Sequence, residues 1–150
     1  MIFSFLRVPA AINGPWRFLI PEPTAATFEG SRDKAIAVAL LLVEDDVLIR
    51  MLLSDMLGEI GYTIAAEAGS VDEALEATRK TDFDLAILDA DLGGRSVSPV
   101  ADALVARDIG FVFVTGSDHG LFAYHARPTL RKPFQIDALK RCCTSALSSH

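Results

Sequence analysis

The order of apolar and polar residues follows two different periods from residue 36 onward. Residues 36–43 form a continuous apolar run of strand length, which is typical of a strand buried on both faces. Residues 47–60 carry apolar side chains near helical spacing, with Asp46 ahead of them to open a helix and Gly61 after them to end it. The pattern therefore predicts a buried strand followed directly by a helix.

The same alternation of strand and helix continues along the rest of the chain. The sequence Ser-Val-Asp-Glu at 70–73 is a capping box, which indicates the start of the second helix. Further strands are expected at residues 62–66, 85–88, 111–114 and around Leu130, and further helices at 70–80, 97–107 and 135–147. Residues 118–127 hold Gly120 and two histidines, so we expect a short or irregular helix there. Five strands alternating with five helices predict an α/β fold with a doubly wound, five-stranded parallel sheet.

Residues 1–35 do not share this alternation. They hold four of the seven prolines, four phenylalanines and the one tryptophan, without the period of a helix or a strand. We interpret them as an N-terminal extension of a folded domain at residues 36–147, with residues 148–150 as a tail. The extension is a mobile tail, the product of an upstream start codon, or a docking peptide anchored by Trp16, Phe18 and Leu19. The sequence leaves these alternatives open.

Charge, cysteines and run lengths narrow the classes of function. The formal net charge is -6 and the 14 basic residues include no run longer than two, which disfavours a nucleic-acid binder. Cys142 and Cys143 are sequence neighbours, so they cannot form a disulfide scaffold, and a reducing cytoplasm is the simplest compartment. The longest apolar run has nine residues, against roughly 20 for a membrane-spanning helix. We therefore expect a cytoplasmic protein without a membrane span.

The polar residues that follow the predicted strands carry the candidate chemistry. Four of the strands are followed in turn by Glu44, Asp45 and Asp46, by Asp89, by Thr115 with Gly116, and by Lys132 with Pro133. In a doubly wound sheet, groups beyond the carboxyl ends of the strands gather at one edge. Taken singly, each of these groups has an ordinary structural explanation, because acidic residues cap helices and Thr-Gly or Lys-Pro pairs form turns. Their conjunction at one edge predicts a functional site.

Several carboxylates held together need a positive partner. Like charges at close range are costly unless a cation or a proton joins them. Lys132 can supply one positive charge, and a hard divalent cation such as Mg²⁺ can supply the rest, since it prefers carboxylate, water and phosphate oxygens. An aspartate beside Mg²⁺ and a lysine can attack phosphorus and carry an acyl phosphate. These residues thus indicate phosphoryl chemistry.

The strand-end segments resemble those of the response-regulator receiver domain of two-component signalling. The resemblance covers roughly residues 36–147. It rests on the order and spacing of the segments LLLVEDD at 40–46, LAILDADLGG at 85–94, FVFVTG at 111–116 and LRKPF at 130–134. It implies a flavodoxin-like (βα)5 fold with strand order 2-1-3-4-5, and a cis peptide bond between Lys132 and Pro133.

The resemblance also implies a role for each residue of the site. Asp89 would be the phosphoacceptor, and Thr115 and Lys132 would contact the phosphoryl group. The cofactor would be Mg²⁺, with ligands from Glu44, Asp45, Asp89 and the backbone carbonyl of Asp91.

Two features depart from the usual receiver pattern. Thr129 stands three positions before the lysine, where typical receivers carry the Tyr or Phe of a switch coupled to the threonine. The connection between Thr115 and Lys132 is also short. Both features resemble an atypical alphaproteobacterial-type subgroup, which implies an HWE-type or related sensor histidine kinase as partner. Phe122 and Tyr124 are the nearest aromatic candidates for a switch: they either pack a short helix or report a change of order in the segment around them.

The resemblance implies a single-domain response regulator rather than an enzyme. A histidine kinase or a histidine phosphotransfer protein would phosphorylate Asp89 in a Mg²⁺-dependent phosphorelay. Output would be by protein contact or by draining phosphate, since the chain ends about one helix after Lys132. Two alternatives remain: a haloacid-dehalogenase-like phosphatase, whose D-x-D motif Asp89-Ala-Asp91 would match, and a non-phosphorylated adaptor with a receiver fold. The identity of the kinase, the downstream target and a homodimeric state stay open.

Overall fold

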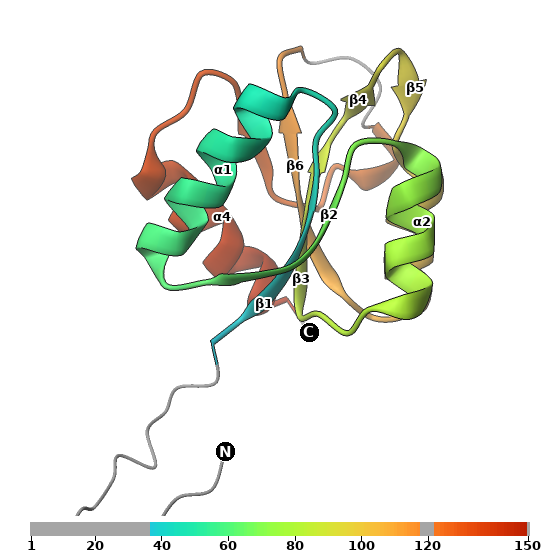
Figure 1. The fold of residues 1–150 in the computed structure, drawn as a ribbon, viewed down its shortest axis with the longest axis horizontal. Helices are drawn as coiled ribbons and strands as arrows, with labels where there is room; N and C mark the ends of the chain where they lie inside the picture. The colour runs from blue at the N-terminus through green and yellow to red at the C-terminus, as the bar shows by residue number, and fades with distance from the viewer. Residues whose placement is uncertain (1–36, 118–121, 150) are drawn as a thin grey trace, which may run out of the picture. The chain divides into compact units, whose positions relative to one another are not determined.

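The computed structural model describes residues 37–117 and 122–149 (Figure 1). These residues belong to the second of the two units into which the chain divides. The expected extension at residues 1–35, with its candidate anchors, lies outside the described residues. So do the first residue of the expected first strand and residues 118–121 of the weak element. The domain bounds at residues 36–147 stay a prediction.

One parallel sheet forms the centre of the fold. Its strands are β1 (Ala39–Val43), β2 (Thr63–Ala68), β3 (Leu85–Asp89), β6 (Gly110–Thr115) and β7 (Thr129–Arg131). They are ordered β2-β1-β3-β6-β7, which is the order 2-1-3-4-5 expected for five successive strands. Every residue of β3 and β6 is buried, as both faces of a central parallel strand require. The α/β, doubly wound fold class is therefore confirmed.

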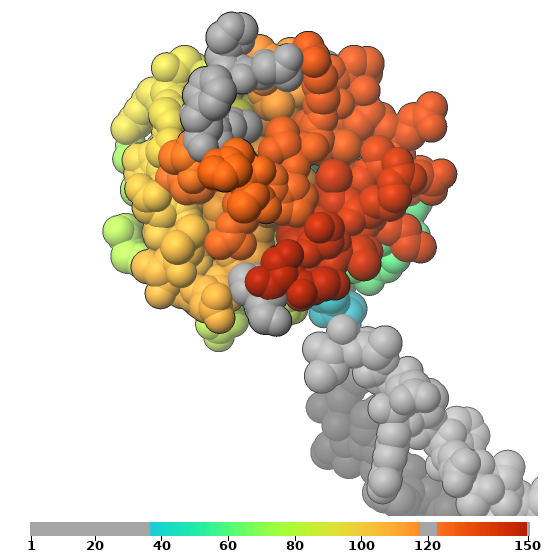
Figure 2. All heavy atoms as spheres, turned by 180° about the vertical axis from the view of Figure 1, so that it is seen from behind, coloured from blue at the N-terminus to red at the C-terminus, as the bar shows by residue number. Residues whose placement is uncertain are grey.

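In the part of the chain that the structure describes, four α-helices cover this sheet (Figure 1): α1 (Val47–Ile60), α2 (Val71–Lys80), α3 (Ser98–Ala106) and α4 (Ile136–Leu147). The buried side chains of α1 and α4 pack against one face, and those of α2 and α3 against the other. Figure 2, seen from behind, shows α3 and the chain that follows it spread over one side of the molecule, from yellow to red.

The short or irregular helix expected between β6 and β7 is confirmed in the residues that the structure describes there. That stretch contains one 3-10 turn, η1 (Phe122–Tyr124). The connection is short, and Pro128 disfavours helical backbone at Arg127 just before β7. The irregular character expected from Gly120 and the histidines fits this outcome, although Gly120 itself lies outside the described residues.

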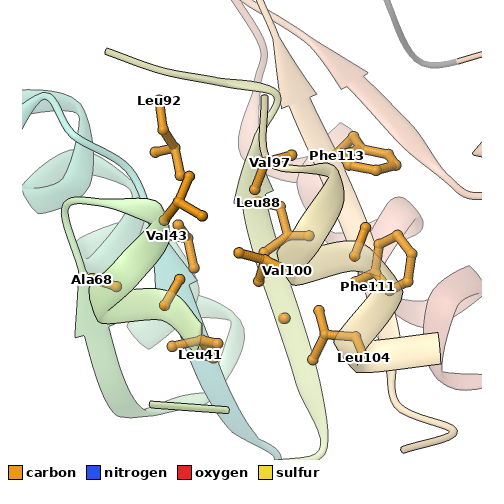
Figure 3. Packing of buried hydrophobic residues seen from close by; sticks show 14 of the residues in the cluster. Leu41, Val43, Ala68, Leu88, Leu92, Val97, Val100, Leu104, Phe111 and Phe113 are labelled. Carbon is orange, nitrogen blue, oxygen red and sulfur yellow. The ribbon is translucent and has the colours of Figure 1, made fainter. Parts of the chain in front are cut away.

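Alternation along β1 divides the core into two clusters. Leu41 and Val43 point toward α2 and α3, in the cluster that Figure 3 shows. Leu40 and Leu42 point the other way, into the cluster beneath α1 and α4. Successive side chains of a strand face opposite sides, so an apolar run without interruption is what a strand between two helix layers needs. The sheet is thus packed on both faces beneath the ends of its strands.

Local capping agrees with the sequence at both early helices. The side chain of Asp46 accepts hydrogen bonds from the amides of Leu48 and Ile49, and Gly61 ends α1 with a φ of 100°. Ser70 caps α2 by accepting from the amide of Glu73. In a complete capping box the Glu73 carboxylate would accept from the amide of Ser70. Here it accepts instead from the amide of Gly69, at 2.7 Å. This difference anchors the loop between β2 and α2.

A two-stranded hairpin that the sequence pattern did not predict follows β3. Its strands are β4 (Asp91–Leu92) and β5 (Arg95–Ser96), which pair antiparallel. Gly93 and Gly94 form the turn with φ values of 58° and 80°, a conformation that glycine adopts without steric cost. Strands of two residues are too short to carry a periodic signal.

Membrane insertion receives no support from the helices. Among the residues that the structure describes, no helix combines the length and the apolar character needed to cross a bilayer.

Candidate functional site

The topology brings the first and third strand ends together. β1 and β3 are neighbours in register, with Val43 paired to Leu88. Glu44 and Asp45 follow Val43 directly, and Asp89 follows Leu88. The carboxyl-end rule for parallel sheets thus places the acidic loop beside Asp89, as the sequence predicted.

Three carboxylates converge at this edge. Glu44, Asp45 and Asp89 each offer an oxygen, and these oxygens lie within 4.8 Å of one another. Glu44 is 1% exposed and Asp89 is 7% exposed, whereas Asp45 faces solvent. The group therefore has a buried side toward the sheet and an open side toward water.

Lys132 reaches the two buried carboxylates from the opposite end of the sequence. Its ammonium nitrogen Nζ lies 2.9 Å from Oε2 of Glu44 and 3.3 Å from Oδ2 of Asp89. The peptide bond to Pro133 is cis, as expected. The backbone amide of Lys132 donates to the carbonyl of Thr115 at 2.8 Å, which continues the pairing of β7 with β6.

Burial and charge act on both partners of this ion pair. Burial raises the pKa of the Glu44 carboxyl above its usual value, against the opposing effect of its hydrogen bond from Lys132. Burial by itself would lower the pKa of Lys132, but the hydrogen bond to Glu44 and the charge of Asp89 raise it. The ammonium group is therefore held in its charged form.

The donor set fits a hard divalent cation. All three side chains offer oxygen atoms, the kind of ligand that Mg²⁺ prefers. One ammonium group cannot balance three carboxylates, so a second positive charge would relieve their repulsion. Asp45 lies on the open side, where a partly hydrated ion can approach.

Backbone amides orient the carboxylates further. The amide of Asp46 donates to Oε1 of Glu44, and the amide of Asp91 donates to Oδ1 of Asp89, each at 3.1 Å. The Asp91 carboxylate turns away and accepts from the amide of Gly94 at 3.0 Å. The expected role of the Asp91 carbonyl as a metal ligand stays a prediction.

Thr115 ends β6 at the same edge and is 5% exposed. Its hydroxyl donates to the carbonyl of Ser117 at 2.5 Å and accepts from the Ser117 amide at 3.1 Å. The loop after β6 thus holds this hydroxyl, and contact with a phosphoryl group would require it to exchange partners.

Position 129 holds a threonine, and the aromatic ring of the stretch before β7 that packs on β6 is that of Tyr124. The Tyr124 ring packs 5.5 Å from that of Phe113, centroid to centroid. Its hydroxyl donates to Oδ1 of Asp102 at 2.5 Å. Thr129 is exposed and donates to the carbonyl of Arg127.

Two features near the site escaped the sequence analysis. Arg50, on α1, donates to the carbonyl of Glu44 at 2.8 Å. The glycine turn of the hairpin comes close to the acidic loop, since a Cβ at Gly93 would lie 3.7 Å from Oδ2 of Asp45. Arg50 could have been suspected from the sequence, because it lies six residues after Glu44 on the helix that directly follows the acidic loop.

An apolar surface adjoins the acidic loop. The first turns of α1 expose four large apolar side chains: Val47, Leu48, Met51 and Leu52. Leu48 is 77% exposed, although exposed positions on a helix of a soluble domain are usually polar. A partner that approaches Asp45 can contact this surface.

Comparison with known proteins identifies the family. Residues 40–143 match the response regulator receiver domain, and the chain belongs to this family. Receiver domains bind Mg²⁺ at an acidic pocket, interact with histidine kinases or phosphotransfer proteins, and are generally not enzymes.

Individual relatives agree with this assignment. The transcriptional regulatory protein PdtaR of Mycobacterium tuberculosis is 34% identical over 118 residues, which cover 71% of this chain and 55% of PdtaR. The chain thus spans about half the length of the curated relatives it matches.

Solved structures give the same result. The solution structure of SdrG from Sphingomonas melonis Fr1 is 41% identical with a TM-score of 0.67, over 74% of this chain and 96% of SdrG. The crystal structure of TrrA from Thermotoga maritima in complex with Mg²⁺-BeF is 29% identical with a TM-score of 0.64, over 73% and 99%.

Proposed function

We propose that this protein is a phosphorylatable response regulator whose phosphoacceptor is Asp89. The observation that carries the proposal is the joint contact of the Lys132 ammonium with Glu44 and Asp89, with Asp45 beside them. A carboxylate in this setting is held at the sheet edge by a backbone amide and a fixed positive charge, while its surroundings stay open to a donor.

The transfer would proceed by exchange of one bond to phosphorus. A carboxylate oxygen of Asp89 attacks the phosphorus of a phosphohistidine, an O–P bond forms, and the N–P bond breaks. The imidazole nitrogen keeps the electron pair and takes up a proton from water. Lys132 stabilises the negative oxygens of the transferred group, and Thr115 can donate to one of them after leaving Ser117.

Glu44, Asp45 and Asp89 would hold Mg²⁺, with the backbone carbonyl of Asp91 as a further ligand. Bound there, the ion would neutralise charge on the phosphoryl oxygens. The binding of Mg²⁺-BeF by TrrA supports this assignment by similarity.

The phosphodonor would be a sensor histidine kinase, of the HWE or a related type, or a histidine phosphotransfer protein. The apolar surface of α1 beside the acidic loop supports docking of such a partner. Output would follow by protein contact or by draining phosphate, because the acidic net charge of -6 disfavours nucleic acid. The free thiols of Cys142 and Cys143 suit a reducing cytoplasm.

The two alternatives receive less support. A haloacid-dehalogenase-like phosphatase would use Asp91 as an acid, yet the Asp91 carboxylate accepts from the Gly94 amide, and Asp89 follows the third strand rather than the first. An adaptor that is never phosphorylated would not need the contacts of Lys132 with both buried carboxylates.

Labelling with acetyl phosphate in the presence of Mg²⁺ tests the proposal. The wild-type protein should gain one phosphoryl group, detected by mass, and removal of Mg²⁺ with a chelator should prevent the gain. Asp89→Asn should abolish labelling, because an amide oxygen cannot carry an acyl phosphate. Asp91→Asn is the matched control and should still be labelled. Equal labelling of the Asp89→Asn protein would show that another residue is the acceptor.

A further inference from the structure

We propose that Arg50 is a positioning residue for the acidic pair Glu44 and Asp45. It would hold the peptide group between them so that both carboxylates converge on Asp89. The proposal rests on the proposed function, since it gives Arg50 a role in Mg²⁺ binding at that same site.

Arg50 bridges two loops at the edge of the sheet. Its Nη1 donates to the carbonyl oxygen of Glu44 at 2.8 Å, and its Nε lies 3.5 Å from Oε2 of Glu67. The Arg50 side chain is 21% exposed, whereas the Glu67 side chain is 46% exposed. The bond to the carbonyl is therefore the better shielded of the two contacts, and the ion pair is the weaker.

The absence of a side chain at Gly69 makes room for the guanidinium group. A Cβ at Gly69 would lie 3.0 Å from Nη1 of Arg50 and 4.0 Å from the carbonyl oxygen of Glu44. The Gly69 amide is itself held at 2.7 Å by the Glu73 carboxylate. The wall of this space is thus fixed from the far side, so an added methyl group would press on the guanidinium and shift it slightly away from the Glu44 carbonyl.

The bonded carbonyl belongs to the peptide group that joins Glu44 to Asp45. A peptide group is planar, so fixing its carbonyl oxygen also fixes the direction in which the Asp45 amide and Cα leave it. A second fixed point of this loop is the Glu44 amide, which donates to the carbonyl of Ala68 at 3.0 Å. Together these bonds restrict the directions in which the two acidic side chains leave the backbone.

Mutual repulsion is the reason such a restraint matters. The three carboxylate oxygens lie within 4.8 Å of one another, and like charges at this range favour spreading of the loop. Glu44 and Asp89 are anchored by Lys132, but Asp45 is exposed and has no such contact with the ammonium. The backbone bond from Arg50 acts on the peptide immediately before Asp45.

A purely structural role is the competing explanation. If Arg50 only joins the loops after β1 and β2, its loss lowers the stability of the fold without a separate effect on the metal. Arg107 provides a matched comparison, because its guanidinium also donates to a backbone carbonyl, that of Thr78, far from the acidic loop in the sequence. It also lies over the ring of Phe83.

Calorimetric titration with Mg²⁺, paired with thermal unfolding without the ion, separates the two explanations. Arg50→Met should raise the Kd for Mg²⁺ by about tenfold or more, the usual cost of losing a residue that orients metal ligands. Gly69→Ala should raise the Kd in the same direction with Arg50 still present. Arg107→Met should lower the unfolding temperature and leave the Kd unchanged. Glu67→Gln should also leave the Kd unchanged, since it removes only the exposed ion pair.

The other possible results of these titrations decide between the two explanations as well. A folded Arg50→Met protein with wild-type affinity overturns the positioning role, as does an equal loss of affinity in Arg107→Met or Glu67→Gln. If Arg50→Met does not fold, Gly69→Ala decides, and unchanged affinity in that variant overturns the role. Failure of the wild-type protein to bind Mg²⁺ would instead refute the metal site of the proposed function, independently of Arg50.

Discussion

Lys132 joins parts of the site that lie far apart in the sequence. It is separated from Glu44 by 88 positions, yet its Nζ lies 2.9 Å from a carboxylate that is almost fully buried. A buried carboxylate without a positive partner is costly, so the ammonium group makes the burial of Glu44 tolerable. In the proposed function, the same charge would also stabilise the oxygens of an incoming phosphoryl group.

Asp45 is the residue at which stability and function oppose each other. Asp45→Ala should raise the unfolding temperature of the metal-free protein, because it removes one of three mutually repelling carboxylates. The same change should weaken Mg²⁺ binding and remove most of the stabilisation that added Mg²⁺ produces. Thermal unfolding with and without Mg²⁺ measures both effects.

Asp55→Ala is the control for this prediction, since Asp55 is an exposed acid on α1 outside the carboxylate group. It should leave the response to Mg²⁺ unchanged. A stabilising effect of Mg²⁺ that survives intact in Asp45→Ala would contradict the assignment of Asp45 as a ligand.

At the scale of elements, the stretch from β6 to β7 is short and irregular, as expected from the sequence. Its described part contains the 3-10 turn η1, and Tyr124 fastens this turn to α3. The Tyr124 ring also packs against Phe111 and Phe113 of β6. Burial and the bond to Asp102 raise the pKa of the Tyr124 hydroxyl, so it stays a donor at neutral pH.

Tyr124→Phe should loosen this attachment while keeping the ring. The variant loses the hydroxyl bonds to Asp102 and to the Ser98 carbonyl, which we expect to cost about 1 kcal/mol of unfolding free energy. Amide hydrogen exchange over residues 122–128 should become faster. In the wild-type protein, Mg²⁺ with beryllofluoride should slow exchange over the same residues if this segment responds to the phosphoryl group.

Thr129→Ala is the control, because Thr129 is exposed and its hydroxyl donates to the nearby Arg127 carbonyl. It should change exchange over residues 122–128 much less. Unchanged protection there, while the loops after β1 and β3 respond to beryllofluoride, would mean that the signal leaves through another face.

At the scale of the whole molecule, a buried thiol on α4 makes the free energy of unfolding depend on pH in the alkaline range. Cys143 is fully buried in the cluster beneath α1 and α4, and burial raises the pKa of its thiol from 9.0 to about 12. Between these values the unfolded chain releases the proton and the folded chain keeps it. The unfolding free energy is therefore unaffected by this group below pH 9 and falls as the pH rises toward 12.

Cys143→Ala should make this alkaline loss of stability shallower, by up to about 1.4 kcal/mol per pH unit within that window. Urea unfolding at several pH values measures the slope. Ser145→Ala changes an exposed position on the same helix and should leave the slope as in the wild type. An unchanged slope in Cys143→Ala would assign the alkaline sensitivity to other groups, such as Tyr62, whose pKa burial also raises.

The sequence by itself determined the five strands of the parallel sheet, the helices between them and the polar residues that follow the strands. A strand covered on both faces is apolar along its length, so the apolar runs at residues 36–43, 85–88 and 111–114 were recognisable without their neighbours. Caps such as Asp46 and Ser70 act on amides two or three residues away, and they were equally visible. Parallel topology then required the residues after the strands to meet at one edge.

Only the tertiary structure decided which of those residues touch, and how. The bonds of Lys132 to Glu44 and of Arg50 to the Glu44 carbonyl join separate loops, and their geometry depends on strand register and on the space left at Gly69. The hairpin after β3 and the hydrogen bond from the Thr115 hydroxyl to the Ser117 carbonyl lie in short turns. Such turns contain too few residues for a periodic pattern of apolar and polar positions. Local patterns encode contacts a few residues apart, whereas these contacts exist only once the sheet has assembled and brought distant loops together.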